Sequence, residues 1–354
     1  MAISVFDHPF LSGLFGDDEI VSRFTAEADV GAMLSFEAHL ARAEAEEGII
    51  DPESAEAIES ACGTLVPDMD ALRAATGRDG VVVAELVRQL RAAVGEPHAS
   101  KVHFGATSQD VIDTSLSLRL MPVLQVLKER LDQLDDALDE LDRRFGANPL
   151  MGRTRMQAAI AMTVGDRLAE WRRPLLRRLA EFEEVQRSAI AMQFGGPVGT
   201  LDKLGGKGER VRKRLSDLLG LEDAETWHSE RDRLVGLADW FSLVSGSLGK
   251  FGQDVALMAQ NGIDEIALSG GGGSSAMAHK HNPVGAEILV TLARFNAVQI
   301  SAMHQAMVHE QERSGAAWSL EWMVLPQIVA ATGASLRIAL DLARAVQRIG
   351  SDSR

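Results

Sequence analysis

The chain has 354 residues, of which 46% are hydrophobic and 25% are charged, a composition typical of a soluble globular protein. Its net charge of −15 argues against general binding to nucleic acid or to anionic membranes, so an anionic substrate would need a local basic pocket. Cys62 is the only cysteine, which excludes an internal disulfide and suits a cytoplasmic location.

The N-terminal segment, MAISVFDHPFLSGLFGDDE, lacks the basic and then apolar order of a signal peptide. No uncharged apolar run reaches about 18 residues, so we expect no membrane-spanning helix. Residues 22–48 are rich in alanine and glutamate, with apolar residues at helical spacing, and they predict a first helix that stops at Gly48. Pro52 suits the first turn of a second, shorter helix.

Five long helical segments follow, at residues 113–145, 157–193, 229–260, 283–309 and 318–349. Apolar residues recur along them at helical spacing, while strand signals are almost absent. At 1.5 Å per residue such helices are about 40–50 Å long, well above the mean for globular proteins. The sequence therefore predicts an all-α protein, with residues 1–112 as an N-terminal helical domain and residues 113–354 as an elongated bundle of long helices.

Some of these segments are apolar on nearly every face, for example residues 328–342. A helix of this kind needs packing partners on all sides, and one chain can hardly supply them. We therefore expect the bundles of several subunits to pack together.

The unusual chemistry lies in the predicted loops, at residues 64–80, 95–105, 146–153, 194–208 and 263–279. In the last of these, SGGGGSSAMAHKHNPVGAE (residues 269–287) has no phosphate-loop pattern, and without H-E-x-x-H the pair His279 and His281 does not indicate a metal site. A linker ending at Asn282 and Pro283 would explain the proline alone. The serines and Lys280 suit a hinged loop that closes over an anion.

Three other segments carry candidate binding groups. Residues 102–114, VHFGATSQDVIDT, place Thr107 and Ser108 at the start of a helix, where they either cap the helix or bind a carboxylate. Residues 152–157, GRTRMQ, place two arginines just before a long helix, as an anion fork or as solvated charge. Residues 193–200, QFGGPVGT, form a glycine-rich turn that begins with the amide of Gln193.

The order of these motifs resembles the fumarase/aspartase superfamily, which includes argininosuccinate and adenylosuccinate lyases. The family signature, approximately GSSxMPxKxNPxxxE, matches Gly273 to Glu287, with Ala278 in place of the proline. HFGATSQDVIDT and GRTRMQ resemble the two other conserved regions of the family, so the resemblance covers nearly the whole chain.

The resemblance implies an all-helical homotetramer with a core of roughly twenty helices and active sites shared between subunits. It also implies that the small C-terminal domain of the superfamily is missing or nearly so. Ser274 would remove a proton α to a carboxylate, while Lys280 and Asn282 would hold the aci-carboxylate that forms. No metal or organic cofactor is implied. The substrate-binding positions would be His103, Thr107, Ser108, Arg153, Thr154, Arg155, Gln157, Gln193, Ser275, Met277, His279 and Arg313.

Two absences select a branch of the superfamily. Its lyases usually carry histidine where Arg155 stands, and adenylosuccinate lyases carry another at the position of Gly80. The segment after Arg313 and Ser314 also lacks the phosphate-binding pair of those lyases. The pattern is similar to the lactonizing cycloisomerases of protocatechuate breakdown, whose substrate is a small tricarboxylate.

The missing histidine also has a physical reason. A lyase that expels an amine or hydroxide needs an acid, whereas lactone opening expels a carboxylate, whose pKa of about 4 lets it leave unprotonated. The position is then available for binding. Arg153, Arg155, Lys280 and Arg313 suit a substrate with a charge of about −3 at neutral pH.

Two alternatives stay open at this point. One is a fumarate-releasing lyase of the same superfamily with His103 or His279 as the acid. The other is a catalytically inactive structural paralogue, against which Ser274, Lys280 and Asn282 argue.

Overall fold

The computed structural model describes residues 4–270, 272–273 and 281–351. Five residues of the loop signature with predicted roles, Ser274, Ser275, Met277, His279 and Lys280, lie outside this part of the chain. Their roles therefore stay predictions.

The elements follow one another along the chain in this order: α1 (Ser12–Phe15), α2 (Asp18–Val21), η1 (Ser22–Phe24), α3 (Ala26–Glu46), α4 (Pro52–Thr64), α5 (Met69–Asp79), α6 (Val83–Val94), η2 (Ala99–Lys101), α7 (Ser108–Phe145), β1 (Pro149–Thr154), β2 (Gln157–Thr163), α8 (Val164–Ala189), η3 (Asp202–Lys207), α9 (Gly208–Leu219), α10 (Asp232–Met258), β3 (Ile266–Leu268), α11 (Val284–Ala306), α12 (Gly315–Arg344) and β4 (Val346–Ile349).

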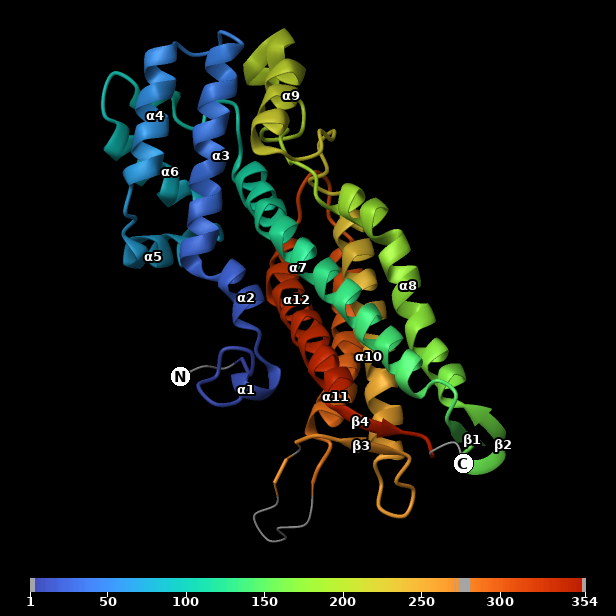
Figure 1. The fold of residues 1–354 in the computed structure, drawn as a ribbon. Helices are drawn as coiled ribbons and strands as arrows, with labels where there is room; N and C mark the ends of the chain where they lie inside the picture. The colour runs from blue at the N-terminus through green and yellow to red at the C-terminus, as the bar shows by residue number, and fades with distance from the viewer. Residues whose placement is uncertain (1–3, 271, 274–280, 352–354) are drawn as a thin grey trace.

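The five long helices α7, α8, α10, α11 and α12 form an elongated bundle, which confirms the predicted helical fold (Figure 1). The leucines of α7 recur every three or four residues and point into the bundle, and burying each one contributes on the order of 1.5–3 kcal/mol. The fully or almost fully buried members of this row are Leu120, Leu124, Leu127, Leu131, Leu134, Leu138 and Leu141.

Helix α7 is 38 residues long and contains Pro122, so this proline lies inside the helix and does not cap it. At 1.5 Å per residue the helix spans about 57 Å. Its first and last turns are therefore at opposite ends of the bundle (Figure 1).

Helix α12 is the apolar centre of the bundle. Among the described residues it alone is long and apolar enough to cross a membrane, yet 78% of its most apolar window is buried inside the structure. It contacts α7, α10 and α11, and this packing on several sides is what its apolar faces require.

Helices α3 to α6 form a separate group beside the start of α7 (Figure 1). Helix α3 packs against α4, α7 and α9. The predicted loop at 64–80 is wrong, because it contains α5. The capping signals of α5 are plain in the sequence: the Asp68 side chain accepts the Ala71 N–H, and Gly80 ends the helix with φ +76°.

The prediction of a helix from residue 157 is also wrong. Residues 149–163 form a β-hairpin, in which β1 and β2 pair antiparallel and Thr154 faces Gln157. Arg155 and Met156 make its turn with φ of +51° and +65°. Thr163 then caps α8, since its hydroxyl accepts the Asp166 N–H at 3.1 Å, and the alanines before it belong to a strand.

The end of the last long helix also differs from the prediction. Helix α12 stops at Arg344, and residues 346–349 pair as β4 with β3. These pairings make two small two-stranded sheets in the described part of the chain, both at the end of the bundle where α7 finishes (Figure 1).

Candidate active site

The predicted binding residues fall into two groups at opposite ends of the bundle. Thr107, Ser108, Gln193 and Arg313 lie around the first turn of α7, a region we call the α7 start. The hairpin residues and the base of the signature loop lie at the other end, which we call the hairpin end (Figure 1).

At the α7 start, one buried carboxylate organises the backbone. The Asp110 side chain is fully buried and accepts the N–H groups of Gly195 and Gly196 at 2.9 Å and of Thr107 at 3.0 Å. His228 Nε2 lies 2.9 Å from the same carboxylate. These contacts fix the glycine-rich turn against the start of the helix.

Gln193 belongs to the same scaffold. It is fully buried, and its amide nitrogen donates to Thr226 Oγ1 at 2.9 Å and to Asp110 Oδ1 at 3.3 Å. Its amide oxygen accepts the Trp227 N–H at 2.7 Å. Both amide protons are used inside the protein, and the side chain holds the turn in place.

Arg313 contacts Thr107 at the start of α7, as is required if both residues bind the same substrate. Its Nη2 lies 3.4 Å from both Thr107 Oγ1 and the Pro197 carbonyl oxygen, and its Nε donates to Gln109 Oε1 at 2.7 Å. Thr107, Ser108 and Arg313 are half-buried, so a ligand has access to them. A guanidinium beside hydroxyls and a helix N-terminus suits a carboxylate.

His103 lies four residues before Thr107, with φ +62° and a side chain that is 14% exposed. Its Nδ1 is 2.6 Å from Glu37 Oε1 on α3. Burial acts to lower the pKa of His103, but the Glu37 charge and hydrogen bond outweigh burial and raise it above its usual value. The Glu37 contact therefore favours a second cation near the α7 start.

At the hairpin end, Arg153, Thr154, Arg155 and Gln157 are exposed. Arg153 Nη1 contacts both oxygens of Glu265, at 2.6 and 2.7 Å, so its charge is partly balanced. Arg155 stands at the tip of the hairpin and lines a hollow of about 350 Å³. The predicted pair of arginines is present, on a strand and a turn and not at a helix start.

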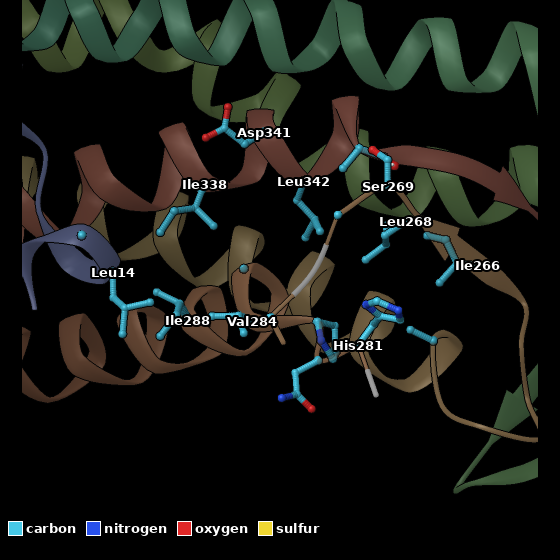
Figure 2. Close-up of a pocket in the computed structure, with 18 of the residues that line it drawn as sticks. Leu14, Ile266, Leu268, Ser269, His281, Val284, Ile288, Ile338, Asp341 and Leu342 are labelled. Atoms are coloured by element: carbon cyan, nitrogen blue, oxygen red, sulfur yellow. The ribbon is translucent and has the colours of Figure 1, made fainter. Parts of the chain in front are cut away.

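The base of the signature loop is closed by backbone pairing. Gly272 and Asn282 exchange two N–H···O hydrogen bonds of 3.0 Å, and a Cβ on Gly272 would lie 2.5 Å from Val284 Cγ2. Asn282 and His281 border a cavity of about 490 Å³. Figure 2 shows Ile338 and Leu342 of α12 pointing across this cavity toward α11.

The two ends cannot meet within one chain. Thr107 and Arg313 lie at the first turn of α7, whereas Arg155 and Asn282 lie beyond its last turn, about 57 Å away along the helix. Any site that uses both groups must combine different copies of the chain.

Sequence patterns missed three polar residues of the α7 start, namely Glu37, Gln109 and Asp113, all buried. The four-residue spacing of Gln109 and Asp113 is the available signal, because it puts both on one face of α7. Within the described residues no three histidine, cysteine, aspartate or glutamate side chains are placed to hold a metal ion.

Comparison with known families decides the membership of the chain. Residues 15–299 match the family model described as Lyase. The chain belongs to this lyase family. Membership confirms the superfamily that the loop signature and the order of the motifs predict.

Relatives of this lyase-family chain are similar along most of its length. It is 35% identical over 345 residues to 3-carboxy-cis,cis-muconate cycloisomerase of Acinetobacter baylyi, covering 95% of this chain and 76% of the relative. It is 39% identical over 326 residues to the enzyme of that name from Pseudomonas aeruginosa, covering 90% and 71%. The crystal structure of 3-carboxy-cis,cis-muconate lactonizing enzyme from Pseudomonas putida superposes with a TM-score of 0.90 at 36% identity, over 96% of this chain and 77% of that one.

Proposed function

We propose that this chain is an intramolecular lyase, a cycloisomerase that converts 3-carboxy-cis,cis-muconate to a carboxymuconolactone in the β-ketoadipate pathway of protocatechuate breakdown. The observation that carries the proposal is Arg155, a permanent cation at the exposed tip of the hairpin, in the motif where superfamily lyases carry an acid histidine. The names of the similar proteins described above support the same assignment.

The chemistry needs anion binding and one proton transfer. One substrate carboxylate adds to the carbon β to another carboxylate, and the electron pair moves into that second group as an aci-carboxylate. Ser274 then delivers a proton to the α carbon, and in the reverse direction it removes that proton. Lys280 and Asn282 hold the aci-carboxylate, because fixed donors facing the developing charge lower the barrier. No acid is needed for the other step, since a carboxylate leaves as a stable anion.

The charged residues have matching tasks. The tricarboxylate carries about −3 at neutral pH, and the chain as a whole is acidic. Arg313 and His103 at the α7 start and Arg155 at the hairpin end offset that charge locally, and Lys280 of the loop signature adds a further cation. Arg153 contributes less, because Glu265 already neutralises part of it.

The site also requires several subunits, and we infer a homotetramer with shared active sites and a core of roughly twenty helices. The distance between the α7 start and the hairpin end supports this assembly. So do the exposed apolar side chains of the hairpin, Met156 at 76% and Ile160 at 77% exposure, which a second copy would cover. A cytoplasmic location fits the single cysteine.

One assay tests the function. The purified chain is incubated with 3-carboxy-cis,cis-muconate while the absorbance of the conjugated diene is followed. We expect the absorbance to disappear, because addition of the carboxylate removes one double bond from the conjugated system. Persistent absorbance, together with fumarate release from argininosuccinate or adenylosuccinate, would contradict the proposal and favour the fumarate-releasing alternative.

A further inference from the structure

Gln109 is a buried amide in the second position of α7, and no loop motif draws attention to it. It is fully buried. Its Nε2 donates to Asp113 Oδ2 at 3.1 Å and to the His228 carbonyl oxygen at 2.8 Å, while its Oε1 accepts the Nε–H of Arg313 at 2.7 Å. The amide thus joins the half-buried arginine to the interior of the bundle.

Behind Gln109 lies a fully buried charge network. Asp113 accepts hydrogen bonds from Arg231 Nη1 at 2.7 Å and from the Trp318 indole N–H at 3.1 Å. Arg231 also donates to both oxygens of Glu321, at 2.9 and 2.6 Å. Burial acts to lower the pKa of Arg231, but the two carboxylates outweigh it and raise the pKa, so the cation persists. The Asp113 carboxylate therefore lies between fixed donors on Arg231 and Trp318.

This network decides which way the Gln109 amide points. Both Asp113 oxygens already accept hydrogen bonds from Arg231, so the side of the amide that faces Asp113 is the NH₂ group. The carbonyl oxygen then faces Arg313. A flipped amide would set two acceptors against each other and leave Arg313 Nε against a donor, which costs the desolvation of several buried groups.

The orientation of Arg313 follows from the same contacts. Its Nε edge is occupied by Gln109, and Nη2 is near Thr107 and the Pro197 carbonyl. Among the described residues Nη1 has no hydrogen-bond partner, so the Nη1–Nη2 edge is the one offered to a ligand. That edge of a guanidinium matches the two oxygens of a carboxylate.

We infer that Gln109 is a positioning residue, which holds the Arg313 guanidinium so that its Nη1–Nη2 edge receives one carboxylate of a tricarboxylate substrate. The inference rests on the proposed function and adds to it the residue that sets the geometry of one substrate contact. Gln109 itself touches no substrate, because it is fully buried behind Arg313.

A double-mutant cycle tests the inference. Steady-state kinetics with 3-carboxy-cis,cis-muconate are measured for the wild type, Gln109→Met, Arg313→Met and the double variant. Gln109→Met should raise KM by between about tenfold and a hundredfold, the range for a lost hydrogen bond to a charged group, with little change in kcat. In the Arg313→Met background the same change should leave KM within about twofold, since no guanidinium remains to be positioned.

A matched control separates positioning from loss of stability. Asn296 is an equally buried amide in the middle of the bundle, where it donates to Ser245 Oγ at 3.0 Å and to Thr332 Oγ1 at 3.1 Å. Asn296→Leu should lower the melting temperature as Gln109→Met does, but leave KM unchanged. If Gln109→Met does not fold, Gln109→Asn keeps an amide and shortens it by one methylene, and it goes through the same cycle.

The inference would be overturned if the KM of the double variant rose by the product of the two single-variant increases. An unchanged KM in Gln109→Met would also overturn it. A wild type without turnover would instead refute the proposed function, and crystal structures of the wild type and Gln109→Met would then decide about Gln109. We expect the Arg313 guanidinium to leave its place beside Thr107 in the variant. An unmoved guanidinium would refute positioning by Gln109.

Discussion

Glu37 and Glu44 are two buried carboxyl groups on one helix, and they show how charge is set residue by residue. They lie seven residues apart on α3, which puts them on the same face. Burial raises the pKa of Glu44 to about 9, and the nearby charge of Glu37 adds to the effect, while Lys101 opposes it. At neutral pH Glu44 is therefore protonated, whereas Glu37 is the carboxyl group that contacts His103.

The first prediction concerns the pH dependence of stability. The folded-state pKa of Glu44 lies above its usual 4.5, so the folded state holds the proton more tightly than the unfolded chain does. The contribution of Glu44 to the free energy of unfolding should therefore be highest below about pH 4.5 and fall by up to about 1.4 kcal/mol per pH unit until about pH 9. Glu44→Gln should remove this decrease in the free energy of unfolding with rising pH.

Urea unfolding at pH 6 and pH 8 measures the effect. Glu27→Gln, an exposed change on the same helix, is the control and should keep the wild-type slope with pH. If Glu44→Gln were no more stable than the wild type at pH 8, Glu44 would not be protonated in the folded protein.

The second prediction contrasts Arg155 with Ser274. A guanidinium stays charged at any working pH and cannot transfer a proton, so Arg155→Ala should raise KM more than it lowers kcat. Salt should weaken the KM effect, because the hairpin tip is exposed and its charge is screened. Ser274→Ala should do the reverse and lower kcat by several orders of magnitude.

Steady-state kinetics at low and high salt distinguish the two roles. An unchanged KM for Arg155→Ala would leave Arg155 as a solvated surface charge. Near-normal turnover of Ser274→Ala would move the proton transfer to another residue, with His103 and His279 as candidates.

At the scale of elements, the long helices were predictable because each leucine or alanine row repeats over many turns, as in α7 and α12. The short elements were not. The alanines of β2 favour a helix, yet the turn at Arg155 and Met156 and the cap at Thr163 make a hairpin. The proposed domain boundary at residue 112 falls inside α7, five residues after it begins, because the motif ahead of it already belongs to the helix.

Part of the candidate site is apparent from the sequence, and part is not. Thr107, Arg155, Asn282 and Arg313 belong to loop motifs with unusual composition, which the sequence displays directly. Gln109 looks like any polar residue of a helix, and its task follows only from contacts with residues more than a hundred positions away, such as His228 and Arg313.

The third prediction concerns the hairpin as an element. Ile160 is 77% exposed in a single chain, and a partner subunit that covers it would have to bury any charge placed there. Ile160→Asp should therefore lower the mass in solution from a tetramer to smaller species, measured by light scattering at micromolar concentration. Ile160→Thr, which is polar and uncharged, should weaken assembly less. A wild-type mass equal to one chain would refute the tetramer itself.

At the scale of the whole molecule, the proposed chemistry depends on the proposed assembly. Thr107 and Arg313 lie at one end of the bundle, whereas Arg155 and Asn282 lie at the other, so a site that uses both groups needs more than one chain. In the proposed tetramer, packing of bundles against one another would bring the opposite ends together and would also cover the exposed apolar residues of the hairpin. We therefore expect activity to require the assembly.

The most direct measurement is complementation between two variants that each lack one part of the proposed site. Ser274→Ala and the double variant Thr107→Val/Arg313→Met are co-expressed with different tags, and the mixed species is assayed for cyclisation of 3-carboxy-cis,cis-muconate below its KM. Each variant alone should be almost inactive. Random mixing should leave about one site in four with both intact parts, so activity should return to roughly that fraction of the wild type. Mixed species no more active than the separate variants would contradict sites shared between chains.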